Sequence, residues 1–329
     1  MDYNIVRKLF ESPKKIVITA HRSPDADAIG SSLSLSHVLT KVGHHCDVVI
    51  PDAFPSFLDW MSGASQIMVF DSSEQEAAAK IKEADLIFCL DYNRLDRIAA
   101  VGDLVRNATA PKILIDHHID PATFDYMLSD TNASSTAELV FDFVSNLDWV
   151  DRIDADVAAC MYAGMMTDTG SFKYPSTTAH THRVAAELMD RGLKPTHVHQ
   201  EIFDNNSFSR LQLIGYALTN KLEFNETNGV SIISLSVDEK SRFNFKKGDT
   251  EGLVNYGLSI GGARMAVFLS EEPAYTKMSL RSKGDLDVNV IAREHFNGGG
   301  HKNAAGGKLD LDISAAVNKV KDVLESLDN

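Results

Sequence analysis

Acidic and imidazole side chains gather at three places in this chain, each directly after a short apolar run. The runs are "KIVITA" (15–20), "DLIFCL" (85–90) and "KILI" (112–115). The side chains that follow them are His21, Asp25 and Asp27, then Asp91, and then Asp116, His117 and His118. Carboxylates at this spacing repel one another unless a cation lies between them. Imidazole and carboxylate donors together suit Mn²⁺, Fe²⁺, Co²⁺ or Zn²⁺ better than the all-oxygen site of Mg²⁺. These residue types therefore predict a site for one or more divalent metals.

The apolar runs predict the elements that would position these side chains. Strands are expected at 15–20, 46–50, 66–70, 85–90 and 112–115, with helical patterns between them such as 27–43, where Gly43 marks the C-terminal stop. Apolar strands that alternate with helices indicate a parallel sheet covered on both faces. Ligands of such sheets bind outside the carboxyl ends of the strands, which lie about 4.8 Å apart, so we expect the side chains to converge. A single aspartate at a strand end is usually a turn former or a helix cap, and only the joint occurrence favours a metal site.

The rest of the chain predicts further helices and a second domain. Helices are expected at 134–147, with Ser135 and Glu138 at capping-box spacing, and at 154–170, which ends near Asp168. Strands are then expected in "GVSIISLSV", "ARMAVFLSE" and "YTKMSLRS", followed by a helix near "DVNVIAREHF". We expect an α/β fold with a catalytic metal-binding domain at 1–190, a helical linker at 191–225 and a smaller α/β substrate-binding domain at 226–329. The active site is expected in a cleft between the two domains.

Composition narrows the class of protein. The chain has 329 residues, of which 44% are hydrophobic and 24% charged, as in a globular enzyme. No apolar stretch approaches the roughly 20 residues that span a bilayer, and the charged start has no signal-peptide core, so we expect a cytoplasmic protein without a membrane partner. The isolated Cys46, Cys89 and Cys160 predict reduced, buried thiols. The net charge of −14, without any basic run, argues against a protein that binds long duplex nucleic acid and favours short nucleotides.

The motifs together resemble the DHH phosphoesterase family. "DHH" stands at 116–118, Asp91 matches the second motif, and Asp168 in "MTDTGSF" matches the fourth. "SLRS" and "GGGHKNAAGG" look like the DHH-associated C-terminal domain, so the resemblance covers nearly the whole chain. The first motif matches at His21, Pro24, Asp25, Asp27, Ala28, Gly30 and Ser31.

The resemblance implies two divalent cations, with Mn²⁺ first and Co²⁺, Fe²⁺ or Mg²⁺ as alternatives, which activate a bridging hydroxide. His21 and Asp25 would hold one ion, Asp91 would bridge both, and the other ion would lie on Asp27, His117 and Asp168. The catalytic residues would be His118, which contacts the reacting phosphate, and Asp116, which supports the site. One departure from the family pattern is that Tyr92 and Asn93 follow Asp91, where they are expected to narrow the mouth of the site or to contact substrate.

The glycine-rich stretch "FNGGGHKNAAGG" (296–307) raises a separate question. Three consecutive glycines usually form a flexible turn, but such a turn can also bring backbone N–H groups close to an anion. Arg281 precedes it at the end of an expected strand, and an arginine fork binds phosphate through two hydrogen bonds. The resemblance implies that this domain holds the terminal phosphate or nucleotide of the substrate. The expected substrate-binding residues are Arg281, Ser282, Gly298, Gly299, Gly300 and His301.

The whole pattern most closely resembles the bacterial nanoRNase and pAp-phosphatase group. The resemblance implies hydrolysis of short oligoribonucleotides to mononucleotides, and of 3′-phosphoadenosine 5′-phosphate (pAp) to AMP. An exopolyphosphatase or pyrophosphatase, or a phosphodiesterase of cyclic or linear dinucleotides, stays open. A RecJ-like single-strand exonuclease would need an added OB-type domain and a more basic groove. A non-catalytic nucleotide-sensing module would have lost ligands that are present here. RNA or DNA preference, the direction of attack and the oligomeric state, including a homodimer, also stay open.

Overall fold

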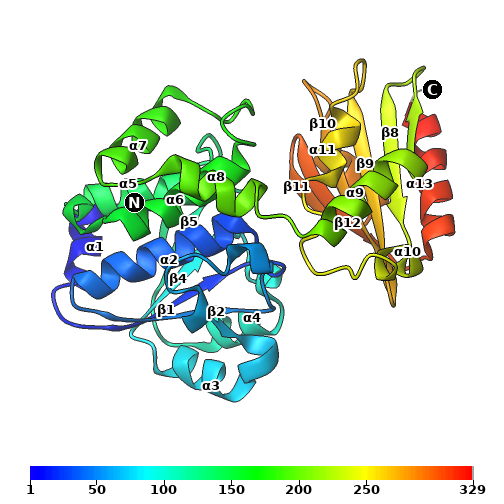
Figure 1. Ribbon diagram of the computed structural model, residues 1–329. Helices are drawn as coiled ribbons and strands as arrows, with labels where there is room; N and C mark the ends of the chain where they lie inside the picture. Colours follow the sequence, from blue (N-terminus) through cyan, green and yellow to red (C-terminus); the bar gives the residue numbers. More distant parts are fainter. Residues whose placement is uncertain (328–329) are drawn as a thin grey trace. The chain divides into compact units, whose positions relative to one another are not determined.

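The computed structural model describes residues 1–327, and these form two compact units, the first of residues 1–205 and the second beginning at residue 206 (Figure 1). Residues 328 and 329, with which the expected C-terminal domain ends, lie outside the described residues. The expected linker is divided between the units, because residues 191–205 belong to the first and 206–225 to the second. The domain limits expected at 190 and 226 stay predictions.

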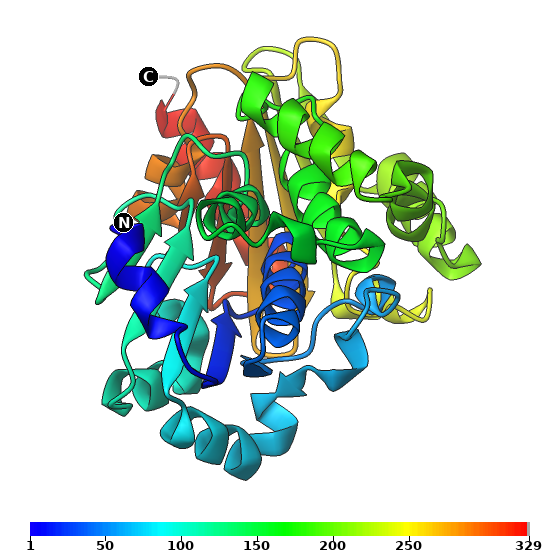
Figure 2. The ribbon, with the colours of Figure 1, turned by 90° about the vertical axis from the view of Figure 1, so that its left-hand side faces the viewer.

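The N-terminal unit is built on a six-stranded sheet in the order β3-β2-β1-β4-β5-β6, in which every neighbouring pair is parallel. Figure 2 shows these strands, blue to teal, running in one direction. The order reverses between β1 and β4, which is the switch point where ligands of such sheets bind. The strands are β1 (Lys15–Ala20), β2 (His45–Ile50), β3 (Met68–Val69), β4 (Leu86–Leu90), β5 (Lys112–Asp116) and β6 (Tyr126–Ser129).

Helices cover both faces of this sheet, because successive residues of each strand point to opposite sides. Ile16 and Ile18 of β1 pack with α2, α5 and α6, whereas Val17 packs on the other side with α3 and α4. The predicted α/β class with a parallel sheet is therefore confirmed. The helices are α1 (Tyr3–Leu9), α2 (Ala26–Lys41), α3 (Phe70–Glu83), α4 (Ala99–Asn107), α5 (Thr136–Asn146), α6 (Ala155–Asp168), α7 (Ala179–Asp190) and α8 (Pro195–Phe203).

Three local features set the helices next to the site. Gly43 has a φ of +99° just after α2, as its predicted role as a stop requires. Ser135 caps α5, because its hydroxyl accepts a hydrogen bond from the backbone N–H of Glu138 at 3.1 Å. The predicted capping box is not completed, since the Glu138 carboxylate accepts from the Ser134 hydroxyl at 2.7 Å instead. A Cβ atom on Gly30 would overlap the carbonyl oxygen of Cys160, so this glycine lets α2 and α6 approach closely.

The C-terminal unit has its own six-stranded sheet, in the order β11-β12-β10-β9-β8-β7. All its neighbouring pairs are antiparallel except β8 with β9. Helices α12 and α13 pack on one face, and α9 and α11 on the other. Its elements are α9 (Phe208–Asn220), β7 (Leu222–Asn225), β8 (Val230–Leu235), α10 (Val237–Ser241), α11 (Leu253–Leu258), β9 (Met265–Glu272), β10 (Tyr275–Ser282), α12 (Val288–His295), β11 (Gly299–His301), β12 (Ala304–Leu309) and α13 (Ile313–Leu327).

Two further expectations concern the thiols and the membrane. Cys46, Cys89 and Cys160 are free thiols, and the last two are buried, while Cys46 is half-buried. Within residues 1–327, no helix combines the length and the apolar character that a membrane span requires.

Candidate active site and metal centre

The predicted ligands stand at the carboxyl ends of three neighbouring strands. His21 follows β1, Asp91 follows β4 and His117 follows β5, and the register pairs Ala20 with Leu90 and Leu90 with Ile115. Three consecutive strands of the sheet therefore end at one level. Asp91 has a φ of +61°, a left-handed backbone that is uncommon outside glycine and recurs at functional sites.

One group of donor atoms consists of His21, Asp25 and Asp91. Nε2 of His21 lies 3.8 Å from Oδ1 of Asp25 and 3.3 Å from Oδ2 of Asp91. Asp25 also caps α2, because its Oδ1 accepts from the backbone N–H groups of Asp27 and Ala28 at 3.0 and 3.1 Å. The cap and the candidate ligand are thus the same carboxylate.

A second group consists of Asp27, His117 and Asp168, the last residue of α6. Nε2 of His117 lies 4.0 Å from Oδ2 of Asp27 and 3.2 Å from Oδ2 of Asp168. The same nitrogen lies 3.6 Å from Oδ1 of Asp91. Asp91 therefore faces the first group with one oxygen and the second group with the other. The structure brings all six predicted ligands together in two groups, and Asp91, a member of the first group, also lies beside His117 of the second.

The imidazoles of the two candidate ligands, His21 and His117, are oriented in a way that suits metal binding. Nδ1 of His21 lies 2.8 Å from the carbonyl oxygen of Arg22, and Nδ1 of His117 lies 3.4 Å from that of Ala133. A proton on each Nδ1 leaves the Nε2 lone pair directed at the carboxylates, as in most metal-bound histidines. The donor set and its orientation fit divalent cations.

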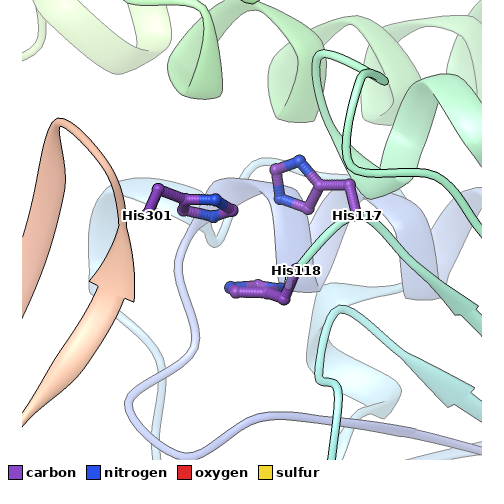
Figure 3. Close-up of side chains that lie close together, drawn as sticks. All are labelled: His117, His118 and His301. Atoms are coloured by element: carbon purple, nitrogen blue, oxygen red, sulfur yellow. The ribbon is translucent and has the colours of Figure 1, made fainter. Parts of the chain in front are cut away.

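His118 is held in a different way. Its Nδ1 lies 2.8 Å from Oδ1 of the fully buried Asp116, and its ring stands at 75° to that of His117 with centroids 5.0 Å apart. Figure 3 shows the two rings on the same side of the segment that carries them. Asp91, Asp116 and His118 also bring donor atoms within 4.8 Å of one another, but the bond to Asp116 occupies Nδ1 of His118. Asp116 therefore orients His118 through Nδ1.

The pKa values of the acidic side chains show that the candidate metal centre holds crowded negative charge, which a bound cation would offset. Burial raises the pKa of Asp27 well above its usual value, and the charges of Asp91 and Asp168 raise it further. Burial, with the charges of Asp25 and Asp91, likewise raises the pKa of Asp168. Burial disfavours the charged ring of His21, but Asp25 and Asp91 outweigh it and raise its pKa well above the usual value. Protons thus offset the crowded negative charge, and a bound divalent cation would replace them.

The expectation that Tyr92 narrows the mouth of the site or contacts substrate is wrong. Its side chain is 0% exposed, and its hydroxyl lies 2.7 Å from Oγ1 of Thr19 within the core between the sheet, α3 and α4. The side-chain amide of Asn93 donates to the carbonyl oxygen of Ile119 at 2.6 Å, so this residue stabilises the loop that follows the DHH motif. The bulk of Tyr92 fills the core because an aromatic ring of this size packs better there than in a polar site.

Thr136 also belongs to the site, although it is not among the residues predicted from the sequence. Its hydroxyl donates to Oδ1 of Asp91 at 2.9 Å. The one available signal was that Thr136 follows Ser135, the predicted cap of α5. The strand-to-helix packing that turns this helix start toward Asp91 cannot be inferred from local pattern.

In the C-terminal unit the structure brings Arg281 and His301 into one row of the sheet. Arg281 in β10 and His301 in β11 both pair with Ala304 in β12, so that the three side chains share a face. Ser282 points to the opposite face and is buried. Its hydroxyl donates to the carbonyl oxygen of Leu286 at 2.6 Å and accepts from Asn303 at 2.9 Å, so it stabilises the loop after β10.

The glycine run forms strand β11 rather than a flexible turn. A Cβ atom on Gly298 would overlap the carbonyl oxygen of Gly306, and Gly300 has a φ of +154°. The backbone N–H of Gly298 donates to the carbonyl of Ala292 at 3.1 Å, and that of Gly300 donates to Oδ1 of Asn289 at 2.9 Å. These two glycines thus permit close strand approach, and their N–H groups are used inside the unit.

A doubly wound parallel sheet with carboxylates and imidazoles at its switch point defines an α/β protein with a candidate divalent-metal site where ligands of such sheets bind. Two family models match the chain, the N-terminal domain of the DHH family over residues 15–165 and the DHHA1 domain over residues 227–328. The chain is 31% identical to the bifunctional oligoribonuclease and PAP phosphatase NrnA of Thermus thermophilus, over 96% of this chain and 90% of the relative. The corresponding protein of Bacillus subtilis is 26% identical over 89% of each chain.

A solved structure agrees with these matches. The crystal structure of an exopolyphosphatase-related protein from Bacteroides fragilis has a TM-score of 0.93 and 40% identity, and the match covers 98% of this chain and 95% of that one. The chain therefore belongs to the DHH family, and it is a divalent-metal-dependent hydrolase of phosphate esters.

Proposed function

We propose that the enzyme hydrolyses short oligoribonucleotides to mononucleotides and pAp to AMP with a pair of divalent cations, Mn²⁺ first. The observation that carries this proposal is the pair of donor groups that share Asp91. The relatives named as bifunctional oligoribonucleases and PAP phosphatases, matched over nearly their full length, support the choice of substrate. Such substrates arise where RNA is degraded, so the proposal includes the cytoplasm as the place of action.

The proposed ligands divide as the donor groups do. His21 and Asp25 would hold one ion, Asp27, His117 and Asp168 the other, and Asp91 both. When bound, the ion pair supplies a water nucleophile at neutral pH and positive charge for the phosphoryl oxygens.

The protein itself contributes positioning and a hydrogen-bond donor. Asp116 holds the Nδ1 side of His118 through a hydrogen bond at 2.8 Å and thereby fixes the orientation of the ring. We assign His118 the role of donating from Nε2 to an oxygen of the reacting phosphate, where negative charge grows in the transition state. Because the ion pair would supply the nucleophile, no side chain would have to form a covalent intermediate.

Substrate selection belongs in this proposal to the shared face of β10 and β11. Arg281 and His301 are separated by two strand spacings, about 10 Å, which allows both to reach one terminal phosphate or its nucleotide. The guanidinium would bind the phosphate through two hydrogen bonds and His301 would add a third donor. The glycines would act indirectly, since they allow β11 to lie close to β12. A net charge of −14 disfavours long polyanions, in agreement with short substrates.

A second candidate function is exopolyphosphatase activity. The 40% identical neighbour from Bacteroides fragilis is described as exopolyphosphatase-related, and the same donors and the same arginine suit a polyphosphate end. The experiment that separates the two is a substrate panel at equal concentration with Mn²⁺, read by chromatography of the products. The panel contains a 5′-phosphorylated diribonucleotide, an RNA 24-mer, pAp, pyrophosphate, polyphosphate, and linear and cyclic di-AMP.

We expect fast turnover of the diribonucleotide and pAp, and slow turnover of the 24-mer. The matched control is Asp91→Asn, which keeps the shape of the side chain and removes one charge from both donor groups, so it should abolish turnover of every compound. Faster turnover of polyphosphate or pyrophosphate than of pAp would contradict the proposed substrate and favour the second candidate.

A further inference from the structure

Thr136, the first residue of α5, contacts two carboxylates that belong to different donor groups. Its backbone N–H donates to Oδ2 of Asp27 at 2.7 Å, and its hydroxyl donates to Oδ1 of Asp91 at 2.9 Å. The next N–H along the helix, that of Ala137, donates to Oδ1 of Asp27 at 2.9 Å. Thr136 and Asp27 are 0% exposed and Asp91 is 2% exposed, so water does not compete for these bonds.

We infer that Thr136 is a positioning residue, whose hydroxyl fixes the orientation of the Asp91 carboxylate so that two cations can bind as a pair. The inference rests on the proposed two-metal site and adds a residue that is not one of its ligands. It concerns the binding of the ions and does not depend on which phosphate ester is the substrate.

The geometry of Asp91 explains why its rotation needs to be fixed. Oδ2 lies 3.3 Å from Nε2 of His21, whereas Oδ1 lies 3.6 Å from Nε2 of His117. The terminal torsion of an aspartate is soft, so the carboxylate can turn away from one group without leaving its rotamer. The hydroxyl of Thr136 removes this freedom, since it holds Oδ1 on the side of His117. A ligand that is to serve two cations requires both oxygens to stay in place.

The two contacts of Thr136 can be separated by mutation. Asp27 is held through backbone N–H groups, which remain when the side chain of Thr136 changes. Their position in the first turn of α5 favours a negative charge on Asp27. Asp91 is held through the hydroxyl, which Thr136→Val replaces with a methyl group of nearly the same size. This variant therefore leaves Asp27 anchored and releases only the rotation of Asp91.

The experiment is Mn²⁺ titration of the full chain by calorimetry, together with the electron paramagnetic resonance signal of spin-coupled Mn²⁺ pairs. We expect Thr136→Val to weaken binding of at least one ion by about 10- to 100-fold, as is usual when a partner of a metal ligand is lost, and to lose the coupled-pair signal. Thr136→Ser keeps the hydroxyl and should bind as the wild type does. The matched control is Thr181→Val in α7. This variant also removes a buried hydroxyl, which accepts a hydrogen bond from the backbone N–H of Thr178 at 3.1 Å.

Two results would overturn the inference. One is a Thr136→Val variant that binds two Mn²⁺ ions within twofold of the wild-type affinity, and the other is a Thr136→Ser variant as weak as the valine variant. If the valine variant does not fold, Thr136→Ala compared with Thr136→Ser makes the same distinction. A wild-type protein that binds fewer than two ions would contradict the proposed function instead, so the two failures are distinguishable.

Discussion

Gly164 in α6 occupies a position where a methyl group would press directly on the candidate metal centre. A Cβ atom there would lie 2.6 Å from Oδ1 of Asp27 and 2.8 Å from Cβ of Ala137, whereas ordinary contacts start at 3.4 Å. Asp27 cannot swing aside without breaking its bonds to the first turn of α5, and Ala137 belongs to that helix. Gly164→Ala should therefore force α5 and α6 apart and shift Asp27.

The size of the effect follows from two opposing contributions. Overpacking of a well-filled core costs about 1–3 kcal/mol, and replacing glycine by alanine inside a helix recovers about 1 kcal/mol. The net loss of unfolding free energy should be about 0–2 kcal/mol, too small to unfold the protein. The displaced carboxylate should lower Mn²⁺ affinity by about 10- to 100-fold. Metal binding should thus suffer more clearly than stability.

The matched control is Gly215→Ala in α9, where a Cβ atom would have nothing within 4 Å. This change should stabilise the protein by about 0.4–1 kcal/mol and leave Mn²⁺ binding unchanged. Urea unfolding and Mn²⁺ titration of both variants provide the comparison. If Gly164→Ala binds Mn²⁺ like the wild type and is as stable as Gly215→Ala, the placement of Asp27 between α5 and α6 is wrong.

Three further predictions test other parts of the site. Asp116→Asn removes the charge that orients His118, so kcat should fall by about 10²- to 10⁴-fold with two Mn²⁺ still bound. An unchanged kcat would contradict the assignment. Arg281→Ala should raise KM for pAp by about 10- to 100-fold at constant metal content, because a hydrogen bond to a charged group is lost. The control Lys277→Ala, on the same face of β10, should leave KM unchanged. Equal KM values for the two variants would refute the role of Arg281. Because the pKa values of Asp27 and Asp168 are raised, and that of His21 lies well above its usual 6.5, metal must displace protons, so Mn²⁺ affinity should rise with pH by about tenfold per unit for each proton released. Mn²⁺ titrations between pH 6 and 8 check this sign, and a flat profile would contradict it.

The placement of the candidate ligands could be predicted because strand ends are readable from sequence. The apolar run 15–20 is β1 without any shift, and the runs at 85–90 and 112–115 differ from β4 and β5 by one residue. Once these strands are parallel, topology alone brings His21, Asp91 and His117 to one edge. The resemblance then added the division of the ligands between two ions, which periodicity alone does not give.

What the sequence did not predict depends on packing between distant segments. Tyr92 follows the candidate ligand Asp91 in sequence, yet the chain turns at Asp91, so the ring of Tyr92 packs in the core. The strand β12 has the sequence "AAGGKL", which lacks the β-branched residues that indicate a strand, and it forms because β10 and β11 pair with it on both sides. β6 is a short, half-buried edge strand and gives an equally weak pattern.

We expect six side chains of the N-terminal unit to hold two divalent cations around one shared carboxylate, that of Asp91. The most direct measurement is anomalous X-ray diffraction from crystals of the full chain grown with Mn²⁺. We expect two manganese peaks. One should contact His21, Asp25 and Asp91, and the other should contact Asp27, His117 and Asp168 as well as Asp91. A single peak, or two peaks that do not share Asp91, would contradict this expectation.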